Sequence, residues 1–330
     1  MRKDLQSGFD RHVLDIDPAN VTRRIEESLR DRIGKHLHRR GAVVGVSGGV
    51  DSAVCVALAT RALGPERVVA LLMPEHDSSP DSTPRGRALC ETLGIEYHLE
   101  DIGAVLEALG CYRRRDEAIR QVFPEFGVGH RSKITVADNL LDENRLNYFN
   151  LTIESPSGDR RKKRMPLEVY LGVVAATNMK QRTRKLLEYY HAERRNYAVV
   201  GTPNRLEYEL GFFVRGGDGL ADIKPIAHLY KTQVYALARH LDVPADICGQ
   251  VPCTDTYSLP QTQEEFYFAL PFEKADLLLY AFLHDVPESQ AAQALDLTPD
   301  QVGRVYRDIV AKRRTAAQLH QPAMLVEGGE

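Results

Sequence analysis

The sequence predicts an α/β fold in which a Rossmann-like, doubly wound parallel sheet is followed by a helical C-terminal region. Short apolar runs alternate with stretches of helical periodicity, as in successive βαβ units. A glycine turn separates one apolar run from the helix after it, and the C-terminal third has mainly helical periodicity. Ligands of such sheets bind at the carboxyl ends of the strands, so we expect a site at this glycine turn.

The elements are predicted in order along the chain. Apolar residues at every fourth position predict a first amphipathic helix over 19–40, and residues 125–165 later interrupt the alternation of strands and helices. Because that stretch is polar and irregular, we expect an insertion or a mobile flap. The other predicted elements are strands over 42–46, 68–73, 95–99 and 197–200, and helices over 51–62, 80–93, 167–195 and 230–241.

Composition limits the classes of function. The net charge of −3 over 330 residues favours neither nucleic acid nor a membrane surface as a partner. No stretch approaches the roughly 20 apolar residues of a membrane span. The five cysteines include no CxxC pair, so we expect reduced thiols and a cytoplasmic protein.

The glycine turn has the features of a phosphate-binding loop. It reads Ser47-Gly48-Gly49-Val50-Asp51-Ser52 and has no lysine of the Walker A kind. Backbone N–H groups at the start of a helix can hold an anion, and the two serine hydroxyls add donors. Asp51 would repel a bare phosphate, so its presence predicts a divalent cation and a Mg²⁺-pyrophosphate site.

This turn resembles the signature of the PP-loop ATP pyrophosphatases, whose fold is of the adenine nucleotide alpha hydrolase type. The resemblance implies ATP and Mg²⁺ as cofactors and cleavage of ATP between its α and β phosphates. The ATP-binding residues that it implies here are Val46, Ser47, Gly48, Gly49, Val50, Asp51 and Ser52.

A second stretch, residues 199–244, resembles the core of the ammonia-dependent NAD synthetases. The matching motifs include Gly201-Thr202, Gly217-Asp218-Gly219 and Leu229-Tyr230-Lys231-Thr232. By resemblance, Glu207 joins Asp51 as a metal ligand. Thr202 and Lys231 contact the ATP phosphates, and Asp218 and Asp222 lie beside the reacting carboxylate and the ammonia. The implied catalytic residues are Asp51, Lys231, Asp218 and Asp222.

Two further segments extend the resemblance. Asn178 and Arg182 belong to an N-x-K-x-R-x-R pattern and share one helix face, where they are expected to bind a substrate phosphate or ribose. Thr254, in Pro252-Cys253-Thr254-Asp255, stands where the family has a phosphate-binding threonine. Residues 125–165 and the segment after Thr254 depart from the family pattern, which leaves the identity of the acceptor carboxylate open.

The resemblance implies the reaction and the organisation of the chain. The expected substrates are deamido-NAD and ammonia, joined through an acyl-adenylate, and the expected assembly is a homodimer formed through long helices. Because only 40 residues precede the α/β domain, nitrogen is expected as free ammonia or from a separate glutaminase subunit. The expected division is an N-terminal helical segment (1–40), an ATP-binding α/β domain (41–250, with 125–165 inserted) and a helical region completing the substrate site (251–330).

Three alternatives stay open at the level of sequence. The first is a PP-loop ligase that amidates a different small carboxylate. The second is a nucleic-acid-binding protein, because residues 285–314 have a helix-turn-helix rhythm and several basic residues. The third is an inactive relative, which the presence of Asp51, Glu207 and Lys231 disfavours.

Overall fold

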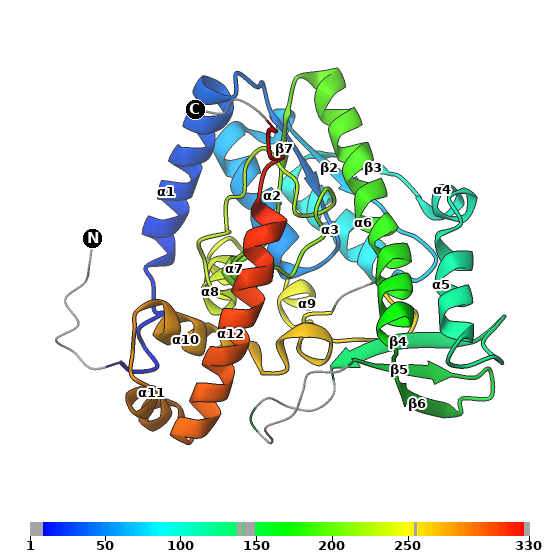
Figure 1. Cartoon of the computed structure of the whole chain (residues 1–330). Helices are drawn as coiled ribbons and strands as arrows, with labels where there is room; N and C mark the ends of the chain where they lie inside the picture. The colour runs from blue at the N-terminus through cyan, green and yellow to red at the C-terminus, as the bar shows by residue number, and fades with distance from the viewer. Residues whose placement is uncertain (1–8, 137–140, 142–148, 254–255, 327–330) are drawn as a thin grey trace.

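A four-stranded parallel sheet lies at the centre of the computed structural model, which describes residues 9–136, 141, 149–253 and 256–326 (Figure 1). The strand order is β3-β2-β1-β7, and every neighbouring pair is parallel. The predicted sheet is therefore confirmed, with each strand end within one residue of its expected position. The strands are β1 (Ala42–Gly45), β2 (Val68–Leu72), β3 (Glu96–Leu99) and β7 (Ala198–Val200).

Helices cover both faces of this sheet, because alternate strand residues point to opposite sides. Val44 and Ala70 pack on the side of α2 (Val50–Leu63) and α3 (Ser82–Leu93). Val43 and Val69 pack on the other side, with apolar residues of α4, α5 and α6. The bounds of these three helices are Gly103–Ala108, Cys111–Arg120 and Leu167–Arg195. The sheet is thus doubly wound, as predicted.

The first helix is shorter than the predicted 19–40. Helix α1 spans Pro18–Asp31 and continues as a π-helical turn over Arg32–His36. The backbone then leaves the helix, because His38 has a φ of 52° and the N–H of Arg39 returns to the Ile33 carbonyl at 2.8 Å. Helix α6, in contrast, has the predicted bounds.

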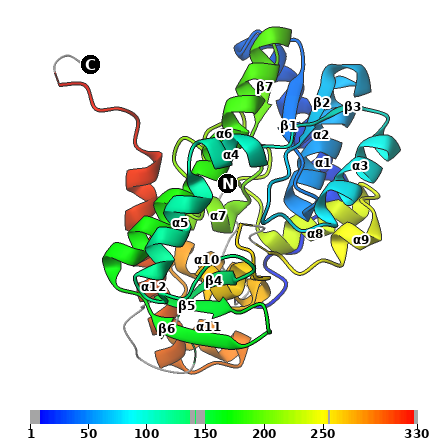
Figure 2. The same ribbon diagram turned by 90° about the vertical axis from the view of Figure 1, so that its right-hand side faces the viewer.

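Residues 125–165 contain a second sheet, so the expectation of irregular backbone is wrong. Strands β4 (Arg131–Val136), β5 (Phe149–Glu154) and β6 (Arg160–Arg164) form an antiparallel sheet in chain order. The sheet lies beneath α5 and the start of α6 (Figure 2). In β4 and β5, apolar residues alternate with polar ones and pack against these helices. The shared apolar cluster includes Ile134, Leu151 and Ile153 from the sheet and Ile119, Val169 and Val173 from the helices.

The C-terminal part of the described chain is helical, as predicted. The division of the chain at residues 40 and 250 stays a prediction. No helix within the described residues has the length and apolar character needed to cross a bilayer. The helices are α7 (Arg205–Leu210), α8 (Lys231–His240), α9 (Ala245–Cys248), α10 (Phe272–Leu283), α11 (Glu288–Leu295) and α12 (Pro299–His320), with a π-helical turn over Glu264–Phe268.

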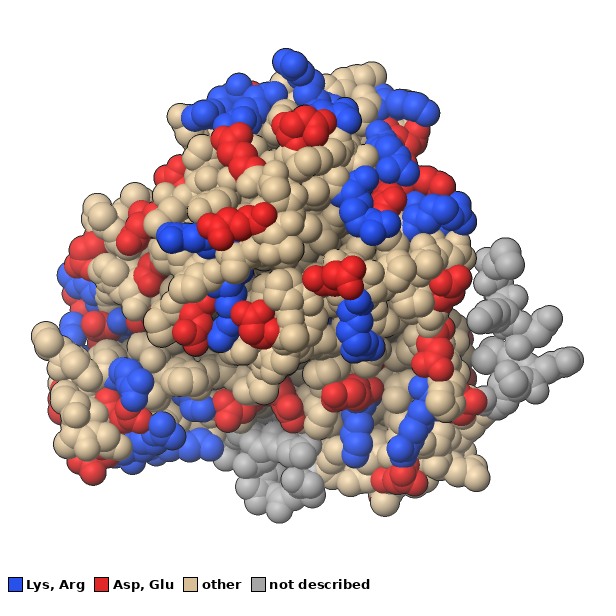
Figure 3. Space-filling view, turned by 180° about the vertical axis from the view of Figure 1, so that it is seen from behind, with Lys and Arg blue, Asp and Glu red and all other residues tan. Residues whose placement is uncertain are grey.

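Two basic residues of the 285–314 segment, Lys312 and Arg313, bond to the rest of the chain. Lys312 of α12 donates to the Tyr267 carbonyl at 2.7 Å, and Arg313 pairs with Glu209 at 3.1 Å. On the face of the molecule in Figure 3, acidic and basic side chains lie interspersed. These contacts favour a packing role for α11 and α12 over the nucleic-acid alternative.

Candidate active site

The glycine turn connects β1 to α2 at the carboxyl end of the sheet. Gly48 has a φ of +79°, and a Cβ there would lie 2.7 Å from the Ser82 carbonyl oxygen, so both conformation and space require glycine. The Ser47 N–H donates to the Ser52 hydroxyl at 3.2 Å, and that hydroxyl donates to the Gly49 carbonyl at 3.0 Å. These hydrogen bonds hold the backbone of the predicted phosphate loop in place through the Ser52 side chain.

Three predicted residues from distant segments meet beside this loop. Asp51 is the second residue of α2, and its carboxylate forms an ion pair with the ammonium of Lys231, the first residue of α8. Asn204 links Asp51 to Glu207, because its side-chain amide donates to Asp51 Oδ1 at 3.2 Å and its backbone N–H donates to Glu207 Oε2 at 3.1 Å. The structure therefore brings Asp51, Glu207 and Lys231 together.

The electrostatics of this group fit a divalent cation. Burial raises the pKa of Glu207 to about 8, and the charge of Asp51 raises it in the same direction. Burial opposes the ammonium form of Lys231, but the charges of Asp51 and Glu207 outweigh burial and raise its pKa. Ionisation of Glu207 beside Asp51 is thus unfavourable with one lysine nearby, and an added cation would favour it.

The number of protein ligands also fits Mg²⁺. Among the described residues, no three His, Cys, Asp or Glu side chains are grouped as a metal site. Mg²⁺ usually takes only one or two carboxylates and completes its shell with water and substrate phosphates. Asp51 and Glu207 beside a phosphate loop are such a pair.

The raised pKa of Glu207 predicts how stability depends on pH in the metal-free protein. Between its unfolded value of 4.5 and about 8, folded Glu207 keeps a proton that the unfolded chain has lost, so stability falls as the pH rises through this window. Glu207→Gln removes that loss. Its melting temperature, measured with a chelator present, should exceed that of the wild type by an amount that grows from pH 5 to pH 8.

The control for this prediction is Glu209→Gln. Glu209 lies in the same helix and pairs with Arg313 at 3.1 Å, away from Asp51. We expect no growing difference for this variant. A difference for Glu207→Gln that stays flat across the pH range would contradict the assigned protonation.

Sequence reasoning missed three residues that support this group. Asp276 is fully buried and accepts from the backbone N–H groups of Lys231 and Thr232 at 3.1 and 2.7 Å, which caps α8. Burial raises the pKa of Asp276 to about 7. Gln263 donates to Glu207 Oε1 at 3.0 Å. Only Asn204 carried a sequence signal, since an asparagine three residues before a glutamate is typical of a capping box.

The two predicted phosphate-binding threonines have different outcomes. Thr202 follows β7 at the carboxyl end of the sheet, the same end as the glycine turn, and its side chain is half-buried. Its contact with ATP stays a prediction. Thr254 lies outside the described residues.

The residues expected at the acceptor carboxylate form a second group, on and beside α6. Asp218 accepts from the Val214 N–H at 2.7 Å, and burial raises its pKa. Its charge also contributes to the raised pKa of Glu207. Exposed Arg182 donates to the Arg215 carbonyl at 3.2 Å. Half-buried Asn178 lies one helical turn before Arg182.

Asp222 is engaged elsewhere. Its carboxylate accepts from the Val199 N–H at 2.8 Å and from the Tyr189 hydroxyl at 3.2 Å. Val199 pairs with Val43, which lies before the glycine turn in β1. Asp222 therefore bonds to the sheet and not to the loop. In this structure Asp222 thus fastens the 217–222 segment to the edge of β7, and its predicted part in catalysis stays a prediction.

Comparison with known proteins decides the family. The model of the family described as NAD synthase matches residues 21–125 and 116–316, which together span most of the chain. The chain belongs to the NAD synthase family. The glycine turn, the group around Asp51 and the residues expected at the acceptor carboxylate all lie within the matched residues.

Relatives within this family extend over nearly the whole chain. An NH(3)-dependent NAD(+) synthetase from Rhizobium meliloti is 53% identical over 319 residues, covering 97% of this chain and 95% of the relative. One from Thermotoga neapolitana is 40% identical over 251 residues, covering 76% and 80%. The fold is similar to that of an NMN synthetase from Francisella tularensis, with a TM-score of 0.65, 22% identity and coverage of 94% and 99%. It is also similar to an NH3-dependent NAD synthetase from Campylobacter jejuni, with a TM-score of 0.61, 23% identity and coverage of 95% and 100%.

Proposed function

We propose that this chain catalyses the ATP-dependent amidation of deamido-NAD by ammonia. The observation that carries the proposal is the grouping of Asp51, Glu207 and Lys231 at a phosphate loop without a Walker lysine. A loop of this kind suits a departing pyrophosphate better than transfer of a γ-phosphoryl group. The NAD synthetase relatives at 50–53% identity support the same acceptor.

In the first half-reaction, a carboxylate oxygen of deamido-NAD attacks the α-phosphorus of ATP. The bond to the β-phosphate oxygen breaks, which gives an acyl-adenylate and pyrophosphate. The backbone N–H groups at the start of α2 bind the phosphates, and the Lys231 ammonium stabilises the charge that develops on the leaving group. Mg²⁺, held by Asp51 and Glu207, would supply further charge neutralisation there.

In the second half-reaction, ammonia attacks the acyl carbon and AMP leaves with the activated carboxylate oxygen. Attack requires neutral ammonia, so a base must take a proton from ammonium. Because burial raises its pKa, Asp218 is a stronger base than an ordinary surface aspartate and suits that role better. Asn178 and Arg182 are proposed to bind the phosphates or ribose of the acceptor.

A homodimer formed through α6 is part of this proposal. The helix has 29 residues and is about 44 Å long. Leu167, Leu171, Leu186 and Tyr190 are each more than half exposed on it. At 3.6 residues per turn, these side chains share one helix face with those of Asn178 and Arg182. A second copy packed on this face would therefore cover Asn178 and Arg182.

The dimer prediction concerns this face. A variant with Leu171→Glu and Leu186→Glu should run as a monomer in size-exclusion chromatography with light scattering, because four charges would meet in an apolar interface. Val310→Glu places a charge at a similarly exposed position of α12 and should leave the dimer intact. A dimer of unchanged mass in the double variant would exclude α6 as the interface.

We further propose that the protein works in the cytoplasm on free ammonia. Buried Cys55, Cys90 and Cys111 are unpaired thiols, which supports a reducing compartment. The ammonia-dependent relatives support the nitrogen source.

The test of the acceptor is a panel assay. The protein is incubated with ATP, Mg²⁺ and ammonium and with deamido-NAD, nicotinic acid mononucleotide or an unrelated small carboxylate, and AMP and amide are measured. We expect both products with deamido-NAD above the other acids. Since one protein of similar fold is an NMN synthetase, the mononucleotide is the sharpest competitor. Turnover of another acid with none of deamido-NAD would overturn the acceptor and keep the ATP chemistry.

A further inference from the structure

Lys180 of α6 is a fully buried ammonium with three acceptors. It donates to Glu75 Oε1 at 3.0 Å, to Asp77 Oδ2 at 2.6 Å and to the Thr256 carbonyl at 2.7 Å, which uses all three of its protons. Glu75 and Asp77 follow β2, whereas Thr256 belongs to a segment almost 180 residues later. One side chain therefore joins three separate parts of the chain.

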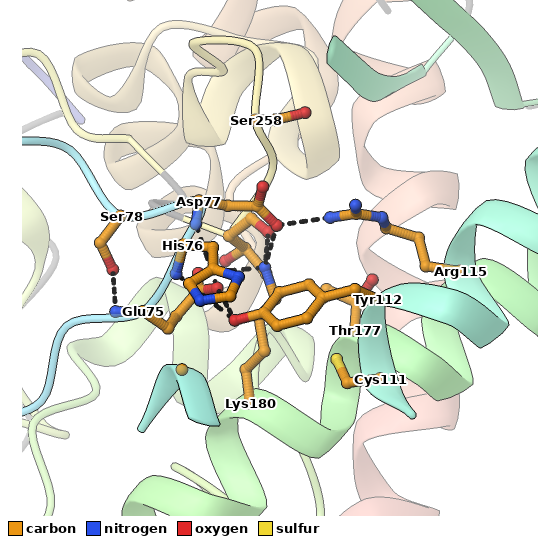
Figure 4. A network of polar contacts seen from close by, with 12 residues as sticks. Glu75, His76, Asp77, Ser78, Cys111, Tyr112, Arg115, Thr177, Lys180 and Ser258 are labelled. Carbon is orange, nitrogen blue, oxygen red and sulfur yellow. Dashed lines mark hydrogen bonds and ion pairs between the residues drawn. The ribbon is translucent and has the colours of Figure 1, made fainter. Parts of the chain in front are cut away.

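The two carboxylates are held from the other side as well (Figure 4). The Tyr112 hydroxyl donates to Glu75 Oε2 at 2.8 Å, and Arg115 forms an ion pair with Asp77 at 2.5 Å. Glu75 and Asp77 are thus balanced in charge by Lys180 and Arg115, and Arg115 also pairs with Asp116 at 2.8 Å. Because these partners fix the carboxylates, the position of the Lys180 ammonium is fixed, and it in turn fixes the Thr256 carbonyl.

The segment that Lys180 holds leads to the proposed metal site. Residues 256–263 are fastened to β4, because the Ser132 N–H donates to the Ser258 hydroxyl at 2.9 Å and the Leu259 N–H donates to the Ser132 carbonyl at 3.1 Å. The segment ends at Gln263, whose amide donates to Glu207 Oε1 at 3.0 Å. Gln263 also lines a cavity of about 580 Å³ that Asn204 and Lys231 share.

We propose that Lys180 is a positioning residue for the ATP half-reaction. It holds segment 256–263 so that Gln263 orients the Glu207 carboxylate toward the cation, and it acts without touching substrate or metal. This role rests on the proposed function. Groups that orient a metal ligand from outside its coordination shell typically change metal affinity or activity by about 10–100-fold when removed.

The test uses Lys180→Met in the full chain, with two measurements. Hydrogen exchange, followed by mass spectrometry without nucleotide or metal, should be faster in peptides covering 256–263 than in the wild type. The Mg²⁺ concentration for half-maximal pyrophosphate release should rise by about tenfold or more, while the rate at saturating Mg²⁺ changes much less. Gln263→Leu should reproduce the raised Mg²⁺ requirement without faster exchange around Glu75 and Asp77.

Lys312→Met is the matched control. Lys312 is a half-buried lysine that bonds one carboxylate, Asp308 at 2.7 Å, and one carbonyl, that of Tyr267 at 2.7 Å. It should lower stability without changing the Mg²⁺ requirement or the exchange of 256–263. If Lys180→Met does not fold, Glu75→Gln is added to restore the charge balance. This double variant is then used in both measurements in place of the single variant.

Two results would overturn the proposal: unchanged exchange of 256–263 in the folded variant, or a loss of maximal rate with an unchanged Mg²⁺ requirement. The exchange comparison decides the role of Lys180 independently of activity. A wild-type chain that releases no pyrophosphate from ATP would contradict the proposed function instead.

Discussion

An Asp51→Asn variant should release AMP and pyrophosphate more than about 100-fold more slowly than the wild type. The expected loss exceeds the usual effect of removing an outer group at a metal site, because Asp51 is proposed to bind the cation itself. The amide keeps the shape of the side chain and can still accept from Asn204. We expect the variant to fold, because loss of the Asp51 charge lowers the pKa of Glu207, whose carboxylate can then balance the charge of Lys231.

The matched control for Asp51→Asn is Asp300→Asn. Both aspartates are the second residue of their helices, so both substitutions remove the same favourable interaction with a helix N-terminus. Asp300 lies in α12 and contacts no part of the glycine turn. Initial rates with saturating ATP, Mg²⁺, ammonium and deamido-NAD are compared. Near-normal turnover by Asp51→Asn would refute the metal assignment.

A Lys231→Met variant should lose about 10²–10³-fold in turnover, the usual effect of removing one donor that stabilises charge in a transition state. Lys231 is only 2% exposed, so its ammonium acts in a site with little competing water. Its removal leaves the Asp51 carboxylate without its partner ammonium, beside the Glu207 carboxyl group. Mg²⁺ should therefore raise the melting temperature of this variant more than that of the wild type.

Loss of one partner of a buried ion pair costs about 3–5 kcal/mol of stability. The turnover of Lys231→Met must therefore be compared with that of a folded variant that also lacks Lys231. The double variant Asp51→Asn with Lys231→Met restores charge balance and should be the more stable of the two. A turnover of Lys231→Met within a few-fold of the wild type would exclude Lys231 from the chemistry. An equal loss of turnover in Lys312→Met would also exclude it, because such a loss would indicate general destabilisation.

The parallel sheet and its helices were predictable, because their signals are local. Buried strands such as Val68–Leu72 are continuous apolar runs, and α6 ends where Asn196 adopts the left-handed conformation typical of a helix C-cap. The antiparallel sheet was not predicted, although Phe149, Leu151 and Ile153 alternate with polar residues. All five residues of its partner strand, Arg160–Arg164, are exposed and charged, so that strand carries no apolar pattern at all.

The candidate site was only partly predictable for a similar reason. Motif resemblance indicated Asp51, Glu207 and Lys231, and the structure places them together. The supporting residues Gln263 and Asp276 act across long sequence distances, and neither belongs to a local pattern. Lys180 is the lysine of the N-x-K-x-R-x-R pattern, but its burial among acids from another loop depends on tertiary packing.

In the proposed reaction, this chain splits ATP between the α and β phosphates by transferring AMP to a carboxylate. Deamido-NAD labelled with ¹⁸O in its pyridine carboxylate would reveal this transfer. Because AMP leaves with the activated oxygen, the predicted result is one ¹⁸O in the phosphate of AMP for each amide formed, with unlabelled pyrophosphate. Label in inorganic phosphate together with ADP, or AMP without label, would contradict the proposed reaction.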